Sequence, residues 1–327
     1  MSIAKYETKD RRLVPGAARV LGTTPLADVE LPQGSWLCTL KPPAPFIPAR
    51  FPVRIDRAGR ASHDITLYRE GEVPAGFAVV PGGEFPYGGI EPGRRQGMTR
   101  VTEDCFFARF PVTCREYLEF LNDLCAQGRI DEARRRAPRD SGHTLWIEEA
   151  SAGRAARFRL PRPDERPAQA WEAEWPVMSV DWHDGLAYCG WRSTRDGIVF
   201  TLPHDEEFEK AGRGLDRRDF PYGPEFDAAY SHTSGSRSSG AAPLPVGSSP
   251  EDESPYGVRD LSGGASTWTL NGAAGASRSL VIIRGGAWSD SGWSSRLTQR
   301  RGSEPETVLS HIGLRLVARP VWHPFPH

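Results

Sequence analysis

The stretch 284-RGGAWSDSGWSSRLTQRRG-302 carries the pattern that decides the fold. It indicates a strand next to a double glycine, followed by small polar residues that surround Trp288 and Trp293. We expect Trp288 to pack in the fold and Trp293, among polar neighbours, to be exposed. Glycine pairs mark tight turns, because glycine adopts backbone angles that other residues avoid. The stretch therefore predicts an ordered loop, which either catalyses a reaction, binds a partner or closes the fold.

The composition of the 327 residues is that of a soluble globular protein. Its 34 glycines and 29 prolines favour short strands and long ordered loops. The formal net charge of −1 argues against nucleic acid as a partner. The chain shows neither a signal-peptide pattern nor an apolar run long enough to span a membrane, so we expect no membrane insertion. The basic residues are almost all arginine, which fits a bacterial source.

The five cysteines (Cys38, Cys105, Cys114, Cys125 and Cys189) form no C-x-x-C pair. Neither a disulfide framework nor a zinc knuckle is indicated. A reducing, cytoplasmic location is the expectation.

Residues 1–75 are expected to form a small all-β domain, a compact sandwich. The stretches 35-SWLCTL-40, 51-FPVRI-55 and 64-DITLY-68 alternate apolar and polar side chains, as half-buried strands do. A linker is expected at 70–76, and 77-FAVVPGGEF-85 begins a larger domain, residues 76–327.

Three helices are predicted in this larger domain. In 113-TCREYLEFLNDL-124 the first and fourth residues form a capping box, and in 181-DWHDGLAYCGW-191 the aspartate can cap. The third, 202-LPHDEEFEKAGRG-214, has proline near its start and glycine where it ends. The acidic residues at the second and third helix starts favour the positive end of the helix dipole, so we interpret them as structural and not as metal ligands. Residues 129–175 are interpreted as a long ordered insertion.

Several segments in register resemble the formylglycine-generating enzyme family, whose fold is related to C-type lectins. The segments are 77–85, 109–121, 176–191 with 202–214, 254-SPYGVRDLSGGASTW-268, and 284-RGGAW-288 with 312-IGLRLVARP-320. The resemblance implies an α+β fold with much irregular loop structure. Its variant is most similar to the domain appended to bacterial serine/threonine kinases, and residues 22–36 resemble the small β module named after its PEGA motif. The chain carries no kinase signature.

The enzymes of this family hold copper with two cysteine thiolates, as the resemblance implies. Their positions fall on Asp290 and Ser295, and no cysteine lies beyond Cys189. Soft thiolates are what Cu(I) chemistry requires. A metal-dependent oxidase is therefore the disfavoured alternative, and we expect a catalytically inactive relative of the enzyme.

The family's calcium ligands are also incomplete. Its asparagine and glutamate are replaced in 263-GGASTW-268 by Gly264 and Thr267. Asp290 with Asp260 is a conjectural substitute. We expect no cofactor, with calcium as a doubtful addition.

What remains is a rigid scaffold that displays residues 288–311. Small hydroxyl residues, tryptophan and arginine are typical of binding surfaces. A non-catalytic module that binds a protein, peptide or glycan is therefore the leading hypothesis. The candidate ligand-binding residues are Trp288, Ser289, Asp290, Ser291, Trp293, Ser294, Thr298, Arg300, Ser303, Glu304 and His311.

Two settings fit this hypothesis. The chain resembles a kinase-associated signalling adaptor, and it also resembles the variable proteins of diversity-generating retroelements, which vary between R-G-G-x-W and the last strand. Here that window is 289–311. A third interpretation makes the β domain a spacer and the window a covering loop.

Overall fold

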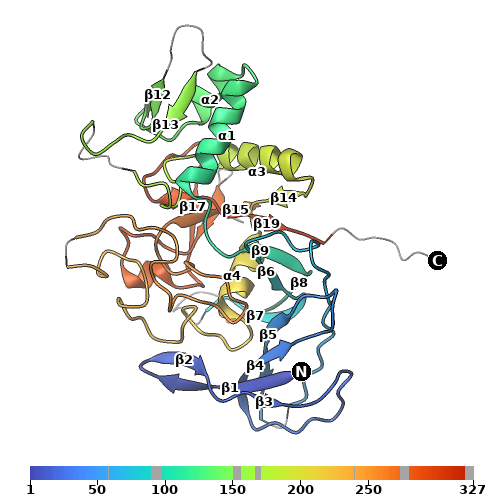
Figure 1. Ribbon diagram of the computed structural model, residues 1–327. Coiled ribbons are helices and arrows are strands. Elements are labelled where there is room, and N and C mark those ends of the chain that lie inside the picture. Colours follow the sequence, from blue (N-terminus) through green and yellow to red (C-terminus); the bar gives the residue numbers. More distant parts are fainter. Residues whose placement is uncertain are drawn as a thin grey trace.

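The computed structural model of the chain places an N-terminal sheet at one end of a larger body of helices, sheets and loops (Figure 1). The structure describes residues 1–57, 59–89, 98–149, 156–165, 171–238, 240–272 and 280–320. Within these ranges no helix is both long enough and apolar enough to cross a membrane.

The N-terminal sheet has the strand order β2-β1-β4-β5, with β3 paired to β1. Its strands are β1 (Ser2–Lys9), β2 (Arg12–Pro15), β3 (Arg19–Val20), β4 (Gly34–Leu40) and β5 (Ala49–Ile55). The predicted strands at 35–40 and 51–55 are confirmed, and they pair antiparallel along their whole length. The predicted strand at 64–68 is wrong, because this segment belongs to no strand; its end is held by a hydrogen bond from the Ile47 N–H to the Tyr68 carbonyl.

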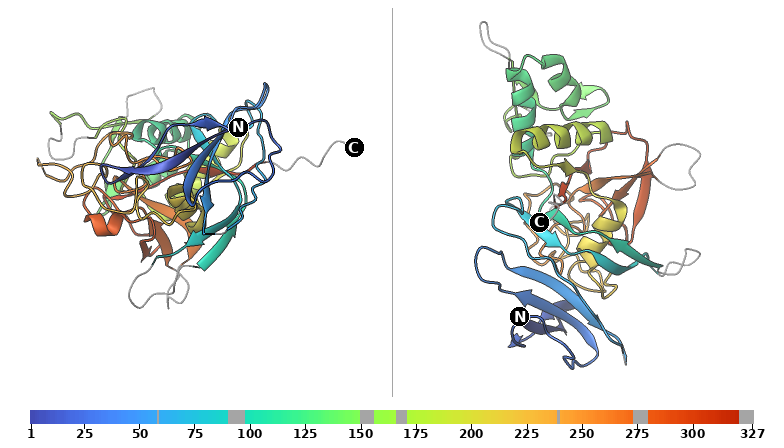
Figure 2. Two further views of the ribbon diagram at one scale, coloured as in Figure 1. Left: turned by 90° about the horizontal axis from the view of Figure 1, so that it is seen from below. Right: turned by 90° about the vertical axis from the view of Figure 1, so that its right-hand side faces the viewer.

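One face of the N-terminal sheet belongs to the core of the larger body. Trp36, Phe51 and Val53 pack in one apolar cluster with Phe107 and Phe208. The predicted sandwich would cover this face with a second sheet of its own. The strands of residues 1–57 instead form a single sheet, and Figure 2 shows it lying against the larger body.

The larger body contains two four-stranded sheets, β14-β19-β9-β6 and β17-β16-β15-β18. Their strands are β6 (Phe77–Val80), β9 (Cys105–Ala108), β14 (Phe200–Thr201), β15 (Ser266–Gly272), β16 (Val281–Arg284), β17 (Arg300–Ser303), β18 (Ile312–Gly313) and β19 (Val317–Ala318). Three hairpins complete the strands: β7 (Gly83–Tyr87) with β8 (Met98–Thr102), β10 (Arg139–Asp140) with β11 (His143–Thr144), and β12 (Ile147–Glu149) with β13 (Arg157–Arg159).

The three predicted helices are confirmed as α1 (Cys114–Ala126), α3 (Trp182–Asp196) and α4 (Asp205–Arg213). Thr113 and Glu116 form the capping box of α1, and Asp181 and Asp184 form that of α3. The acidic residues at the start of α3 thus have the structural role that the sequence predicted. The insertion contains a fourth helix, α2 (Ile130–Arg136), which the sequence did not predict.

Aromatic side chains hold α1 and α3 together. Tyr117 and Tyr188 stack with their ring centres 5.5 Å apart, and Phe120 packs edge-on against Tyr188. Trp268 of β15 is fully buried in the same core, whereas Trp182 and Trp191 are only partly buried at its margin. α4 packs against β7, β15 and β16 and therefore lies under the strand that leads into the glycine pair.

Candidate recognition site

The loop after β16 is folded tightly by its glycine pair. Gly285 and Gly286 have φ values of 94° and 67°, which favour glycine. The chain then turns so sharply that a Cβ on Gly286 would lie 2.7 Å from the Cα of Ser295. The short 3-10 helix η2 (Gly292–Ser295) therefore crosses directly over the glycine pair.

We expect Gly286→Ala to lower the free energy of unfolding by about 2 kcal/mol, because it adds left-handed strain and a backbone overlap. Gly190→Ala is the matched control. A Cβ at Gly190 meets no atom within 4 Å, and alanine favours the helix by about 0.5–1 kcal/mol. Urea denaturation of both variants checks the difference, and equal stability would contradict this account of the turn.

Asp290 and Ser295 are both engaged in contacts that hold the loop. The Asp290 carboxylate accepts two hydrogen bonds from Arg301, at 2.8 and 3.2 Å. The Asp290 carbonyl also accepts the backbone N–H and the hydroxyl of Ser234. Ser295 is fully buried, and its hydroxyl donates to the Gly292 carbonyl at 2.8 Å. Neither side chain is free to serve as an open ligand.

Trp293 of η2 projects into solvent. The residue is 55% exposed, as its polar surroundings in the sequence predicted. The guanidinium of Arg296 lies 3.6 Å from the centre of its ring, a close cation–π contact. Asp219 approaches the same guanidinium at 3.7 Å. Trp293 and Arg296 therefore form a rigid amphipathic pair at the surface.

Trp288 and His311 lie on a neighbouring part of the surface, and both are half-buried. The Trp288 indole N–H donates to the Ser310 carbonyl at 3.3 Å, and its backbone N–H donates to Gly264. Burial lowers the pKa of His311. Trp288 thus serves both as packing and as part of the surface.

Strand β17 places its two arginines on opposite faces of the sheet. Arg300 lies opposite Arg284 and Arg301 lies opposite Ile283 in the register with β16, and residues opposite each other share a face. Arg301 joins Asp290 and the Ser266 hydroxyl. Arg300 instead faces α4 and pairs with Asp205 at 2.9 Å. Residues adjacent in the sequence therefore contribute to different sites.

The other candidate residues are spread along the loop. Ser289, Ser291 and Glu304 are exposed, whereas Ser294, Thr298 and Ser303 are half-buried. We call the set formed by Trp288, Ser289, Asp290, Ser291, Trp293, Ser294, Arg296, Arg301 and His311 the recognition surface. Arg296 was absent from the sequence prediction. Its position three residues after Trp293, one helical turn on, is the signal that would have found it.

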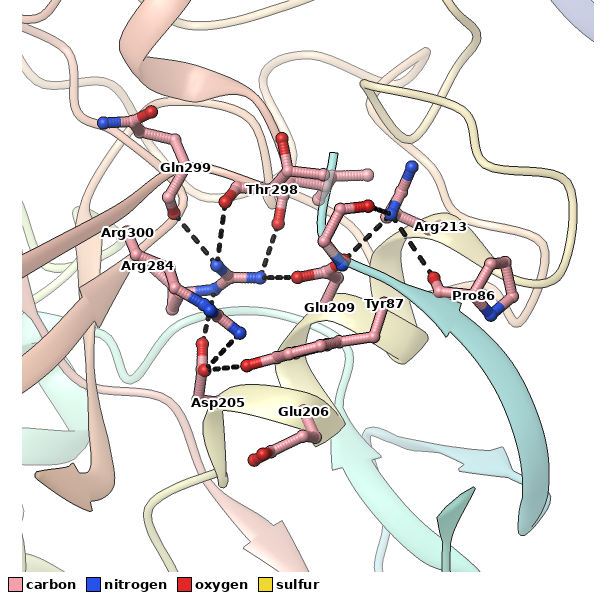
Figure 3. A network of polar contacts seen from close by, with 12 residues as sticks. Pro86, Tyr87, Asp205, Glu206, Glu209, Arg213, Arg284, Thr298, Gln299 and Arg300 are labelled. Atoms are coloured by element: carbon pink, nitrogen blue, oxygen red, sulfur yellow. Dashed lines mark hydrogen bonds and ion pairs between the residues drawn. The ribbon is translucent and has the colours of Figure 1, made fainter. Parts of the chain in front are cut away.

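A buried polar network underlies this loop and is drawn in Figure 3. Glu209 of α4 accepts hydrogen bonds from Arg284 at 2.6 Å and from Arg213 at 2.8 Å. Arg284 also lies 3.1 Å from Asp205, whose other oxygen accepts the Tyr87 hydroxyl. Because Arg284 further donates to the carbonyls of residues 297–299, the network anchors the start of β17.

Residues 67–320 match the family model of the sulfatase-modifying factor enzyme 1-like domain. The chain belongs to this family. The match confirms the resemblance drawn from the spaced segments of the sequence.

Two relatives and two solved structures are similar to this chain. The chain is 27% identical over 282 residues to the inactive C-alpha-formylglycine-generating enzyme 2 of Bos taurus, covering 72% of this chain and 85% of that protein. It is 27% identical over 188 residues to the formylglycine-generating enzyme of Thermomonospora curvata, covering 52% and 59%. PvdO from Pseudomonas aeruginosa has a TM-score of 0.55 at 22% identity, covering 74% of this chain and 93% of that one. Treponema denticola variable protein 1 has a TM-score of 0.52 at 16% identity, covering 75% and 95%. The two structures share the fold.

The residues of this chain do not fit the copper ion of the family's oxidases. Aspartate and a buried serine hydroxyl occupy the two thiolate positions. The five cysteines are all buried, and burial raises the pKa of each thiol, that of Cys38 to about 12. None of them is a ready thiolate. No step of an oxidation follows from these side chains.

The residues at the expected calcium site are also unsuitable as ligands. Thr267 is buried within β15, between its neighbours β16 and β18. Asp290 pairs with Arg301, and Asp260 accepts the backbone N–H of Gly247 at 2.6 Å, so the conjectured Asp290–Asp260 pair has other partners. In the part of the chain that the structure describes, no three histidine, cysteine or acidic side chains gather as a metal site requires.

Proposed function

We propose that this member of the sulfatase-modifying factor family is a non-catalytic binding module whose ligand contacts the recognition surface. One observation carries the proposal. The two positions that hold thiolates in the oxidases are occupied by Asp290, paired with Arg301, and by Ser295, which is fully buried. The loop thus keeps its shape without the atoms that the oxidation requires.

The chemistry of the exposed side chains supports a binding role. Trp293 with Arg296 offers apolar area and fixed charge, the combination that dominates binding hot spots. Asp290 and Arg301 add a charged pair, and the serines of the loop add adaptable hydrogen bonds. A protein, peptide or glycan ligand in the cytoplasm fits these groups. The relationship to a protein named inactive C-alpha-formylglycine-generating enzyme 2 agrees with this direction.

The oxidase alternative is tested directly by oxygen consumption. We expect the purified chain, loaded with stoichiometric copper and given a cysteine-containing peptide, to consume no oxygen above a metal-free control. Metal-dependent consumption that requires the peptide thiol would overturn the proposal.

Substitution of Trp293 tests whether its side chain belongs to the surface or to the core. Because 55% of Trp293 is exposed, we expect Trp293→Ala to lower the free energy of unfolding by less than about 1 kcal/mol. The fully buried Trp268 is the comparison, and Trp268→Ala is expected to cost about 3–5 kcal/mol. If urea denaturation gives Trp293→Ala a loss of the size found for Trp268→Ala, the loop is core and the proposal fails.

The two proposed biological settings of this module predict different variation among related sequences. A variable protein of a diversity-generating retroelement would have siblings that differ at positions such as Ser289, Ser291, Trp293 and Thr298. A kinase-associated adaptor would keep them. Sequencing the DNA downstream of the gene decides the matter: a near-copy of the last coding stretch beside a reverse transcriptase establishes the first setting, and a neighbouring kinase gene without such a copy establishes the second.

A further inference from the structure

Two arginines from different strands lie against the ring of Tyr87. The Arg300 guanidinium of β17 is 4.1 Å from the ring centre, and that of Arg100 on β8 is 5.6 Å away. Arg100 lies opposite Phe85 in the β7–β8 hairpin, so it reaches the ring diagonally across the strands. The side of the sheet turned away from Arg301 thus gathers two cations around one aromatic ring.

The network beneath Tyr87 does not neutralise these cations. It contains the guanidinium groups of Arg213, Arg284 and Arg300 but only the carboxylates of Asp205 and Glu209, which leaves one positive charge in excess. Both oxygens of Glu209 are occupied by Arg213, Arg284 and the backbone N–H of Gly88. A further acidic residue of α4, Glu206, accepts from Asn271 instead. Figure 3 shows Arg300 beside Asp205 and the ring of Tyr87.

Arg300 is the least satisfied member of the network. It shares Asp205 with Arg284 and with the hydroxyl of Tyr87. Its Nε and Nη2 atoms are buried and have no well-directed hydrogen bond, while 32% of its side chain remains exposed. Burial lowers its pKa to about 10. The desolvation of buried N–H groups without well-directed hydrogen bonds is only partly compensated, so this guanidinium retains capacity to bind a further acceptor.

Arg100 supplies the second cation from the solvent side. Its side chain is exposed, and among the described residues no ion pair joins it to a carboxylate. Guanidinium groups bind oxyanions through forked hydrogen bonds, and carboxylate and phosphate are the groups that match this fork.

We propose that Arg100 and Arg300, beside Tyr87, form a subsite for an oxyanion, a carboxylate or phosphate group. The inference rests on the proposed binding function in one respect: the carboxylate or phosphate is taken to be part of the larger ligand that the module binds. The subsite is separate from the recognition surface, because Arg300 and Arg301 project from opposite faces of β17.

The test follows the side-chain Nε–H resonance of Arg300 in the full chain by NMR while acetate or inorganic phosphate is added at constant ionic strength. Arg300→Lys identifies the resonance by its loss. We expect a saturable shift in the millimolar range with at least one of the two anions. Arg100→Gln, which leaves the buried network intact, is expected to weaken the apparent affinity about tenfold, the effect of losing one charge-assisted contact.

Arg135→Gln is the matched control, because Arg135 is exposed on α2 away from the subsite. It should leave the affinity unchanged. A stronger response to acetate assigns the subsite to acidic groups of a ligand, and a stronger response to phosphate assigns it to phosphorylated ones. If neither anion shifts the resonance, or if Arg100→Gln and Arg135→Gln respond alike, the subsite is refuted. The binding-module proposal is tested separately, by the stability of Trp293→Ala and by oxygen consumption, so failure of the subsite does not refute it.

Discussion

Glu209→Ala is expected to lower the free energy of unfolding by about 3–5 kcal/mol, the cost of breaking a buried ion pair by removing one partner. Glu209 is fully buried, and its carboxylate is the partner of Arg213 and of Arg284. Without it, two guanidinium groups that are 2% and 0% exposed lose their closest negative charge. Urea denaturation of the variant and the parent measures the loss.

Glu206→Ala is the control for this prediction. Glu206 lies on the same helix, is half-buried and accepts one long hydrogen bond from Asn271 at 3.3 Å. Its loss should cost less than about 1 kcal/mol. Should Glu209→Ala fail to fold, Glu209→Gln retains the shape and is expected to fall between the two. Equal stability of the Glu209→Ala and Glu206→Ala variants would show that the network does not anchor α4 to β16.

Asp252→Asn is expected to change how stability depends on pH. Asp252 is 1% exposed, one of its oxygens accepts the Ser262 N–H, and the other has no partner. Burial, with the nearby charge of Asp260, raises its pKa to about 7, whereas an unfolded aspartate has a pKa of about 3.9. The folded state therefore binds the additional proton, and the stability that this proton gives is present below pH 4 and lost as the pH rises to 7.

The expected loss of unfolding free energy follows from the pH range between the unfolded and the folded pKa of Asp252. Each pH unit between the two pKa values removes roughly 1.4 kcal/mol, so stability should fall by up to about 4 kcal/mol for this group alone. The neutral asparagine lacks this dependence. The difference in unfolding free energy between the variant and the parent should therefore move in favour of the variant from pH 5 to pH 8.

An exposed aspartate provides the control for the pH series. The side chain of Asp131 is 97% exposed, so Asp131→Asn should keep a constant offset from the parent across the series. A constant offset for Asp252→Asn as well would mean that Asp252 stays ionised in the folded protein.

The sequence predicted the elements whose signals are local. The starts of α1 and α3 depend on side chains three residues apart, and those caps are where they were expected. The segment 64–68 shows the limit of such reasoning. Its residues alternate between apolar and polar, but a strand also needs a partner strand. Within the described part of the chain, this segment has a backbone hydrogen bond to another segment only at its end, where the Tyr68 carbonyl accepts the N–H of Ile47. β1 was missed for the converse reason, because it pairs with the distant strand β4, and β2 was missed with it because β2 pairs with β1.

The site was predictable in composition but not in arrangement. The exposure of Trp293 followed from its polar surroundings, and the lack of thiolates followed from residue types alone. Which of Arg300 and Arg301 anchors the fold depends on the register of β17 against β16, and that register is a tertiary property. The Arg296–Trp293 stack and the Arg100–Tyr87 contact required the folded backbone for the same reason.

The alternation of β17 has a consequence for inheritance. Mutations in neighbouring triplets of the gene disturb different contacts, since a change at Arg301 removes the bonds to Asp290 and Ser266 while a change at Arg300 removes the pair with Asp205 and the contact with Tyr87. Two adjacent codons of one short strand thus act on two separate parts of the molecule.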